Sequence, residues 1–308
     1  MDKVKCTERK NGLLCEVPMR DIEEACKRVL RKNTVEIRGK RYISPKKQHY
    51  PEQFFWDSGF HTIVTRHFDI GLAKDEILSI LSNQWENGFI PHIVYWNFLP
   101  DYPYGAEIST RIQNFVVNRL YDTRREPPTS RITGCPVIGM SSLMVYLKLK
   151  SESFGRYVVN RMCNYFMWLE NRDYDQDNLF SIIHPWENGQ DDHPNFDVVL
   201  GFKRYMLSST LMYNLRYHGY LLNRYKSVNW DEREIEKLDI FNVENVLFNS
   251  TVSAAMLAVS EIARRIKDER AEDLKEKGIK VAEAIERKLF DRKNVLFFDR
   301  KPASDKPW

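Results

Sequence analysis

The sequence has few cysteines and no CxxC pair. Its five cysteines are scattered along 308 residues, at Cys6, Cys15, Cys26, Cys135 and Cys163. An odd number of cysteines without such pairing suggests neither a disulfide framework nor a thiolate zinc site. We therefore expect reduced thiols, as in a cytoplasmic protein.

Long apolar runs and a large excess of one charge are also missing. The N-terminus has no apolar segment of the signal-peptide kind, and no stretch approaches the roughly eighteen uninterrupted apolar residues of a membrane helix. Basic and acidic residues number 47 and 43, which gives a net charge of +4. This near balance is unlike that of a dedicated nucleic-acid binder. We expect a soluble protein without a nucleic-acid or membrane partner.

Signature loops of several enzyme classes are absent as well. The sequence contains no G-x-S-x-G elbow, no Walker-type or dinucleotide-binding glycine loop, and no cysteine in a protease signature. These absences exclude hydrolysis through Ser or Cys and phosphoryl transfer, and we expect no cofactor. No low-complexity linker divides the chain, so we interpret residues 1–308 as a single helical domain whose first part, residues 1–18, is a loose segment.

What the sequence does contain is helical periodicity along most of its length. Apolar residues recur at i, i+3, i+4 and i+7, as in Ile22, Ala25, Cys26 and Val29, and convincing strands are few. The pattern predicts an all-α fold. The expected helices span residues 19–31, 58–68, 73–85, 136–149, 155–170, 200–224, 243–266 and 271–289.

Long loops rich in aromatic residues, His, Asn and Gly separate some of these helices. They cover residues 42–57, 86–106 and 173–197. If helical hairpins stack in a ring, such loops gather on one face, where a rigid scaffold carries function. The tetrapeptide WENG occurs twice, at residues 85–88 and 186–189, but four residues do not establish a repeat.

The loop of residues 184–197, HPWENGQDDHPNFD, is the richest candidate site. A metal could use His184, Asp191, Asp192 and His193, but their spacing is unlike that of the usual ligand sets, and no metal is expected. Alternatively, the charge of Asp192 could raise the pKa of Asp191 and keep a proton available for glycoside hydrolysis. A turn with Asx caps explains the same residues equally well.

Three segments, in order along the chain, resemble a known family. They are residues 50–61 (YPEQFFWDSGFH), 84–92 (QWENGFIPH) and 184–191 (HPWENGQD), and residues 247–250 (LFNS) add a further similarity. Together they are similar to the mannosylglycerate and glucosylglycerate hydrolases of glycoside hydrolase family 63, which are six-hairpin glycosidases with trehalases as more distant relatives. The resemblance implies an (α/α)6 toroid that hydrolyses an α-glycosidic bond of a small carbohydrate with inversion.

The resemblance also implies roles for individual residues. Asp191, in the place of the Asp of the family's E-S-G-x-D pattern, is expected to be the catalytic general acid. Trp56 and Asp57 match a W-D pair that binds the sugar at the bottom of the pocket, and His92 matches the histidine of a P-H-I motif. The remaining expected substrate contacts are Tyr50, Phe54, Tyr102, Trp186 and Gly189.

Some positions depart from the family pattern. Phe54 stands where the family has Trp and therefore lacks an indole donor. Gly134 replaces a Gln that contacts substrate, and Asn188 replaces the usual Ser. These departures leave the sugar and the group attached to it open.

The number of helices also departs from the pattern. A six-hairpin barrel contains about twelve helices, and the periodicity predicts roughly eight here, so we expect an incomplete toroid. The resemblance implies a general base in a C-terminal third that this chain does not reach, with Glu187 and Asp192 as possible substitutes. Otherwise the base comes from a separately encoded C-terminal part or from a homo-oligomer, or the chain is a non-catalytic carbohydrate-binding fragment. A helical scaffold that binds a protein is a third interpretation.

Overall fold

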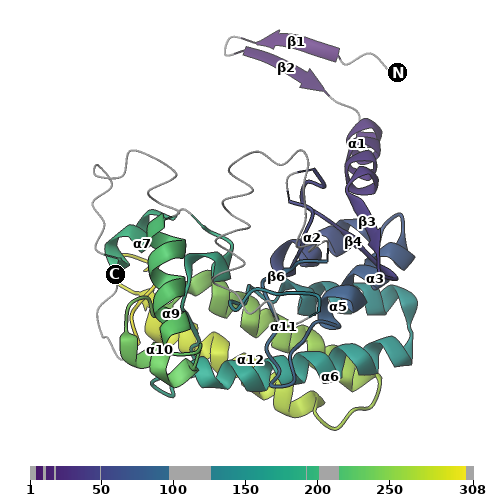
Figure 1. Cartoon of the computed structure of the whole chain (residues 1–308). Coiled ribbons are helices and arrows are strands. Elements are labelled where there is room, and N and C mark those ends of the chain that lie inside the picture. The colour runs from purple at the N-terminus through teal and green to yellow at the C-terminus, as the bar shows by residue number, and fades with distance from the viewer. Residues whose placement is uncertain are drawn as a thin grey trace.

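The described part of the chain is mainly helical. The computed structural model describes residues 5–9, 12–16, 19–48, 50–96, 126–191, 193–200 and 215–302. Its α-helices (Figure 1) are α1 (Met19–Lys32), α2 (Phe55–Thr65), α3 (Ile70–Leu81), α5 (Val137–Leu149), α6 (Glu152–Leu169), α7 (Pro194–Val199), α9 (Asn223–Ser227), α10 (Glu232–Leu238), α11 (Val246–Arg265) and α12 (Ala271–Ala284). The 3-10 segments η1 (Glu170–Arg172) and η2 (Pro185–Asn188) and the π-helical segments η4 (Leu215–Leu222) and η5 (Ile285–Leu289) complete the helical elements of these ranges. The predicted all-α class is confirmed.

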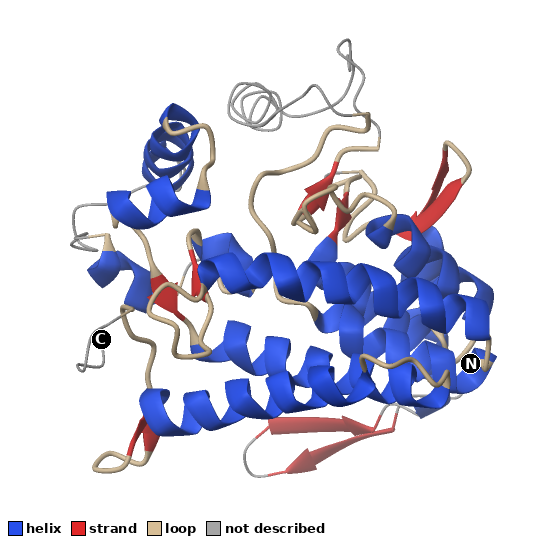
Figure 2. Ribbon diagram, turned by 90° about the horizontal axis from the view of Figure 1, so that it is seen from below, coloured by secondary structure: helices blue, strands red, loops and turns tan. Residues whose placement is uncertain are grey.

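Consecutive helices pack in pairs, α2 with α3, α5 with α6 and α11 with α12. Figure 2 shows the long helices running side by side across the molecule. Helix α11 lies between several of them and contacts α5, α6 and α12. The crossing of α5 and α11 is close, because a Cβ atom added to Gly139 would lie 2.7 Å from the Cβ of Ala255. These contacts join the helices around one large apolar core.

Among the described helices, only α11 is long and apolar enough to cross a membrane. However, 67% of its most apolar window is buried inside the protein. A helix that is apolar on most of its circumference is also what the centre of a large domain requires. Its contacts with three neighbouring helices therefore account for its composition as that of a core helix.

Short antiparallel ladders accompany the helices, and the sequence analysis did not place them. The pairs are β1 (Lys5–Arg9) with β2 (Gly12–Glu16), β3 (Thr34–Ile37) with β4 (Lys40–Ile43), β5 (Gln53–Phe54) with β6 (Ile93–Val94), β7 (Ser181–Ile182) with β8 (Val243–Glu244), and β9 (Phe290–Asp291) with β10 (Leu296–Phe297). Most of these strands have two residues, too few for the alternation that identifies a strand. As a result, parts of the predicted long loops are tied to distant segments of the chain.

The helix predicted over residues 73–85 begins and ends earlier, as α3. Its start is set by Asp69, whose side chain accepts a hydrogen bond from the backbone N–H of Leu72 at 2.8 Å. Its end is set by polar side chains, since the amide of Asn83 donates to the carbonyl of Ser79 at 2.9 Å. Such side-chain bonds compete with the helical ladder, and apolar periodicity does not reveal them.

Other helix boundaries agree with the prediction to within a few residues. Of the helix predicted over residues 200–224, residues 201–214 lie outside the described residues, and the remainder forms η4 and the start of α9. The helix predicted over residues 243–266 begins only at Val246, because the two residues before Asn245 pair as β8. The helix predicted over residues 271–289 is divided into α12 and η5.

Candidate active site

The first two sequence motifs meet in the ladder of β5 and β6. Phe54 on β5 lies opposite Ile93 on β6. The backbone N–H of Phe55 donates to the carbonyl of His92 at 2.8 Å. These backbone bonds hold Phe54 and His92 side by side.

Helix α2 starts earlier than residue 58, where the sequence predicted it. Trp56 and Asp57 therefore lie in its first turn rather than in a loop, and both are half-buried. The N-terminal turn of a helix favours a carboxylate, because the backbone N–H groups there are directed toward it. The fold thus gives Asp57 a fixed backbone and a favourable place for negative charge.

Aromatic rings connect these motifs to the third one. The rings of Phe54 and His92 pack edge to face, with centroids 5.7 Å apart. The ring of His92 lies 6.1 Å from that of Trp186 in η2, and His184 packs against Trp186 at 5.1 Å. Phe54 and Trp186 also pack on the same small apolar cluster, which contains Ile93, Tyr95, Ile132 and Leu222. The residues predicted from separate motifs therefore form one aromatic wall.

Gly189 makes the second connection between the first and third motifs. Its backbone has φ +74°, a left-handed conformation that glycine adopts easily. A Cβ atom at this position would lie 2.8 Å from Cε2 of Trp56. Only glycine lets the backbone approach the indole this closely, so a side chain at position 189 would displace Trp56.

His92 is buried within this wall, with 9% of its surface exposed. Burial lowers the pKa of its imidazole to about 4, so the ring is neutral at pH 7. Its Nδ1 atom has no hydrogen-bond partner among the described residues. A neutral imidazole with a buried nitrogen of this kind is suited to a hydrogen bond with a ligand hydroxyl.

Asp57 lies one helical turn before His61, which faces a second carboxylate from α3. Burial raises the pKa of Asp57, and the charge of His61 opposes this rise. His61 Nδ1 lies 3.1 Å from Oε1 of the fully buried Glu76. Burial works against protonation of His61, but the hydrogen bond to Glu76 and its charge raise the His61 pKa overall. The two carboxylates thus favour the protonated form of His61.

The remaining predicted site residues are less closely connected in the described structure. Tyr50 lies on an exposed turn, where its backbone N–H donates to the carbonyl of Lys46 at 2.8 Å. Asp191 is exposed and follows Gly189 by two residues. Tyr102 and Asp192 lie outside the described residues.

Glu187 was considered above as a substitute base, but it does not lie free to meet a water. Its carboxylate is fully buried and pairs with Arg172, whose Nη1 lies 3.2 Å from Oε2. It also accepts hydrogen bonds from the backbone N–H groups of Thr133 at 3.0 Å and Ile183 at 2.7 Å. With its oxygens occupied in this way, Glu187 does not activate a water, and we no longer consider it as the base.

The sequence analysis missed one carboxyl group of the first motif. Burial raises the pKa of Glu52 to about 7. The neighbouring Tyr42 hydroxyl donates to the carbonyl of Pro51 at 2.5 Å and fixes this stretch. Nothing in the spacing of Glu52 distinguished it from an exposed loop residue.

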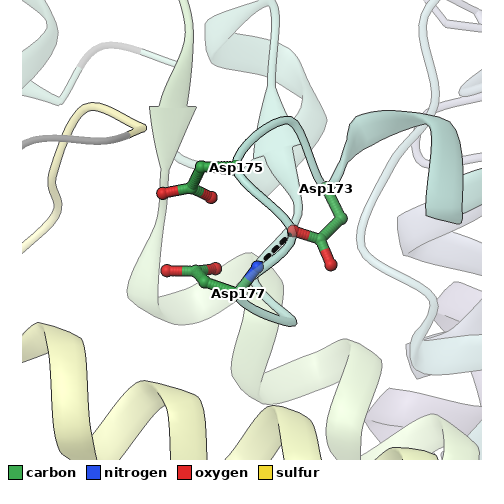
Figure 3. A group of neighbouring side chains, drawn as sticks. All are labelled: Asp173, Asp175 and Asp177. Atoms are coloured by element: carbon green, nitrogen blue, oxygen red, sulfur yellow. Dashed lines mark hydrogen bonds between the residues drawn. The ribbon is translucent and has the colours of Figure 1, made fainter.

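A further group that the sequence analysis missed is the acidic loop after α6. One carboxylate oxygen from each of Asp173, Asp175 and Asp177 lies within 4.8 Å of the others (Figure 3). The chain itself brings positive charge to this loop, since Arg300 pairs with Asp175 and Asp177 and Lys288 lies 2.9 Å from Asp177. The alternating Asp-x-Asp-x-Asp pattern of residues 173–177 is the signal in the sequence for this loop.

An array of helical hairpins whose loops bring aromatic rings, a buried histidine and carboxylates together is typical of the six-hairpin glycosidase class. Residues 50–308 match the family described as the mannosylglycerate hydrolase MGH1-like glycoside hydrolase domain. The chain belongs to this family.

Curated relatives and a solved structure agree with this assignment. The mannosylglycerate hydrolase of Rubrobacter radiotolerans is 29% identical over 283 residues, which cover 84% of this chain and 62% of that protein. The glucosylglycerate hydrolase of Mycolicibacterium hassiacum is 28% identical over 249 residues, which cover 72% of this chain and 55% of that protein. The chain thus spans about three fifths of the length of these relatives.

The crystal structure of a glycoside hydrolase family 63 mannosylglycerate hydrolase from Thermus thermophilus in complex with glucose matches with a TM-score of 0.74 and 25% identity. The match covers 92% of this chain and 68% of that one. It confirms the predicted toroid-type fold and the prediction that this chain spans only part of it.

Proposed function

We propose that this chain is the sugar-binding part of an inverting α-glycosidase that acts on glucosylglycerate, mannosylglycerate or a similar small glycoside. The observation that carries the proposal is the contact between the three motifs. The ring of His92 packs against the rings of Phe54 and Trp186, and Trp56 lies against Gly189. Stacking faces next to polar groups are what a pyranose ring needs.

Each residue has a role in the proposed reaction. Asp191 protonates the leaving oxygen, and its exposure gives it access to a substrate. Asp57 accepts hydrogen bonds from two sugar hydroxyls, while Trp56 and Trp186 offer ring faces. His92, neutral because it is buried, takes part in one further hydrogen bond to the sugar.

The general base is proposed to lie outside this chain. An inverting enzyme needs a second carboxylate about 6.5–9.5 Å from the acid, and Glu187 is committed to Arg172. A homologous C-terminal part, a separate polypeptide or a second copy would supply it. The rival proposal is a non-catalytic carbohydrate-binding protein, for which the aromatic wall of Phe54, His92 and Trp186 would be sufficient. Buried free thiols at Cys135 and Cys163 support a cytoplasmic location for either.

Asp191→Asn is the variant that tests the acid. We expect the variant to bind glucose as the wild type does, because the amide keeps the shape of the carboxyl group but has no proton to give. In a protein that is complete or complemented with the part that supplies the base, turnover of glucosylglycerate, mannosylglycerate and aryl α-glycosides should be lost. Proton NMR of the released sugar gives activity, substrate and anomer in one measurement.

The outcomes separate the two proposals. Turnover by the wild type with release of the β anomer, and none by Asp191→Asn, supports the glycosidase. Equal turnover by both proteins contradicts the role of Asp191. Binding of glucose without turnover by the wild type, even together with the part that would supply the base, favours the carbohydrate-binding protein.

A further inference from the structure

A buried ion pair lies beneath the aromatic wall and takes no part in the proposed chemistry. Arg172 at the end of η1 and Glu187 in η2 have 1% and 0% of their side-chain surfaces exposed. Burial of a charge is costly unless partners satisfy it. The partners of this pair therefore show what the pair holds together.

Glu187 joins the loop that carries Trp186 to the segment that contacts His92. One carboxylate oxygen accepts from the N–H of Thr133 and the other from the N–H of Ile183. The residue before Thr133, Ile132, accepts a backbone hydrogen bond from His92 at 2.8 Å. A single carboxylate therefore links the backbones on both sides of the aromatic wall.

Arg172 is itself held on several sides. Its guanidinium donates to Glu232 of α10 and to the carbonyl of Ser181, and it lies over the ring of Trp168 with 5.0 Å to the centroid. A planar guanidinium directs its N–H groups along fixed directions. Arg172 therefore sets where the carboxylate of Glu187 can lie.

The other WENG segment shows that the turn does not need a buried glutamate. In residues 85–88, Glu86 is exposed, and the N–H of Gly88 donates to the carbonyl of Trp85 at 3.0 Å. The same four residues thus form a turn with the carboxylate in solvent. The burial of Glu187 reflects its three-dimensional surroundings and not the requirements of the tetrapeptide.

We propose that Arg172 and Glu187 are positioning residues of the candidate pocket. The pair fixes the loop of Trp186, Gly189 and Asp191 relative to the backbone of His92, so that the ring faces and the acid meet one pyranose. The expected effect on the position of Trp186 follows from these contacts alone, whereas the expected effect on sugar affinity rests on the proposed function.

The test measures the position of Trp186 directly. The full chain is labelled with 5-fluorotryptophan, and the signal of Trp186 is assigned from its disappearance in Trp186→Phe. We expect Glu187→Gln to shift or broaden the Trp186 signal, because an amide cannot accept from both backbone donors and carries no charge. The signal of Trp96, which donates to the buried Gln53, should stay in place.

Glucose is the probe for the second measurement. We expect Glu187→Gln to bind glucose about tenfold more weakly, because a displaced Trp186 loses part of its contact with the sugar; a tenfold loss corresponds to about 1.4 kcal/mol. Ile262→Ala is the matched control, since Ile262 is a fully buried residue of α11 outside the proposed site. It should lower the melting temperature similarly but leave the Trp186 signal and glucose affinity unchanged.

The results decide the two proposals separately. An unchanged Trp186 signal in folded Glu187→Gln overturns the positioning role, whatever glucose does. A shifted signal with no glucose binding to any form supports positioning and contradicts the proposed function. If Glu187→Gln does not fold, Arg172→Lys takes its place, because lysine keeps the positive charge but lacks the planar guanidinium. The Trp186 signal and the glucose affinity are then interpreted in the same way.

Discussion

At the scale of single residues, His92 shows how burial sets the charge of a side chain. Its pKa falls from the ordinary 6.5 to about 4. Between these values the unfolded chain binds a proton that the folded chain does not. The contribution of His92 to stability is therefore complete above pH 6.5 and is lost as the pH falls toward 4.

This loss can be measured with His92→Gln. Over pH 7 to 4, the free energy of unfolding of the wild type should fall by about 3 kcal/mol more than that of the variant. Urea unfolding followed by tryptophan fluorescence at several pH values gives the comparison. Parallel curves for the two proteins would show that His92 is not held neutral by burial.

Residue identity could be predicted for part of the site only. The motifs contain Phe54, Trp56, His92, Trp186 and Gly189, and these residues do meet. The supporting contacts could not be predicted, because they join residues far apart in the chain. One example is the buried amide of Gln53, whose oxygen accepts from Trp96 at 2.9 Å. A spacing pattern contains no information about such partners.

At the scale of elements, periodicity predicted the long helices well and the short strands beside them poorly. Long amphipathic segments such as α1 and α12 carry enough repeats to be recognised. The two-residue ladders β5–β6 and β7–β8 do not, although they hold site loops in place. In β3–β4, the turn at Arg38 and Gly39, with φ of +50° and +71°, was a usable hairpin signal.

The crossing of α5 and α11 provides a prediction at this scale. Gly139→Ala should destabilise the protein by about 1–3 kcal/mol, because the added methyl would meet Ala255 in a tightly packed contact. Gly219→Ala is the matched control, since a Cβ atom at Gly219 has nothing within 4 Å. It should be neutral or stabilising by up to about 1 kcal/mol.

Urea unfolding of both variants tests this comparison. The helix propensity of alanine favours both substitutions equally, so the difference between them reports packing. Equal stability of the two variants would mean that α5 and α11 can separate without cost.

At the scale of the whole molecule, one arginine connects parts of the chain that are distant in sequence. Arg300 pairs with Asp175, Asp177 and Glu244. It thus ties the segment after β10 to the acidic loop shown in Figure 3 and to β8. Burial raises the pKa of Glu244 to about 8, while the bond to Arg300 opposes this rise. Arg300 is therefore the counter-charge that all three carboxylates share, while Lys288 contacts Asp177 alone.

Arg300→Met tests that dependence. Removing one partner of a buried ion pair costs about 3–5 kcal/mol, and we expect a loss of this size at pH 8. In the variant the buried Glu244 keeps a raised pKa in the folded state, so the folded protein binds a proton there more readily than the unfolded chain. The variant should therefore recover part of its stability as the pH falls from 8 toward 5. Arg264→Met is the control, because Arg264 pairs with Glu261 on an exposed surface and its loss should leave stability nearly unchanged at either pH. If Arg300→Met lost no more stability than Arg264→Met, the acidic loop would be held by its backbone turns rather than by the arginine.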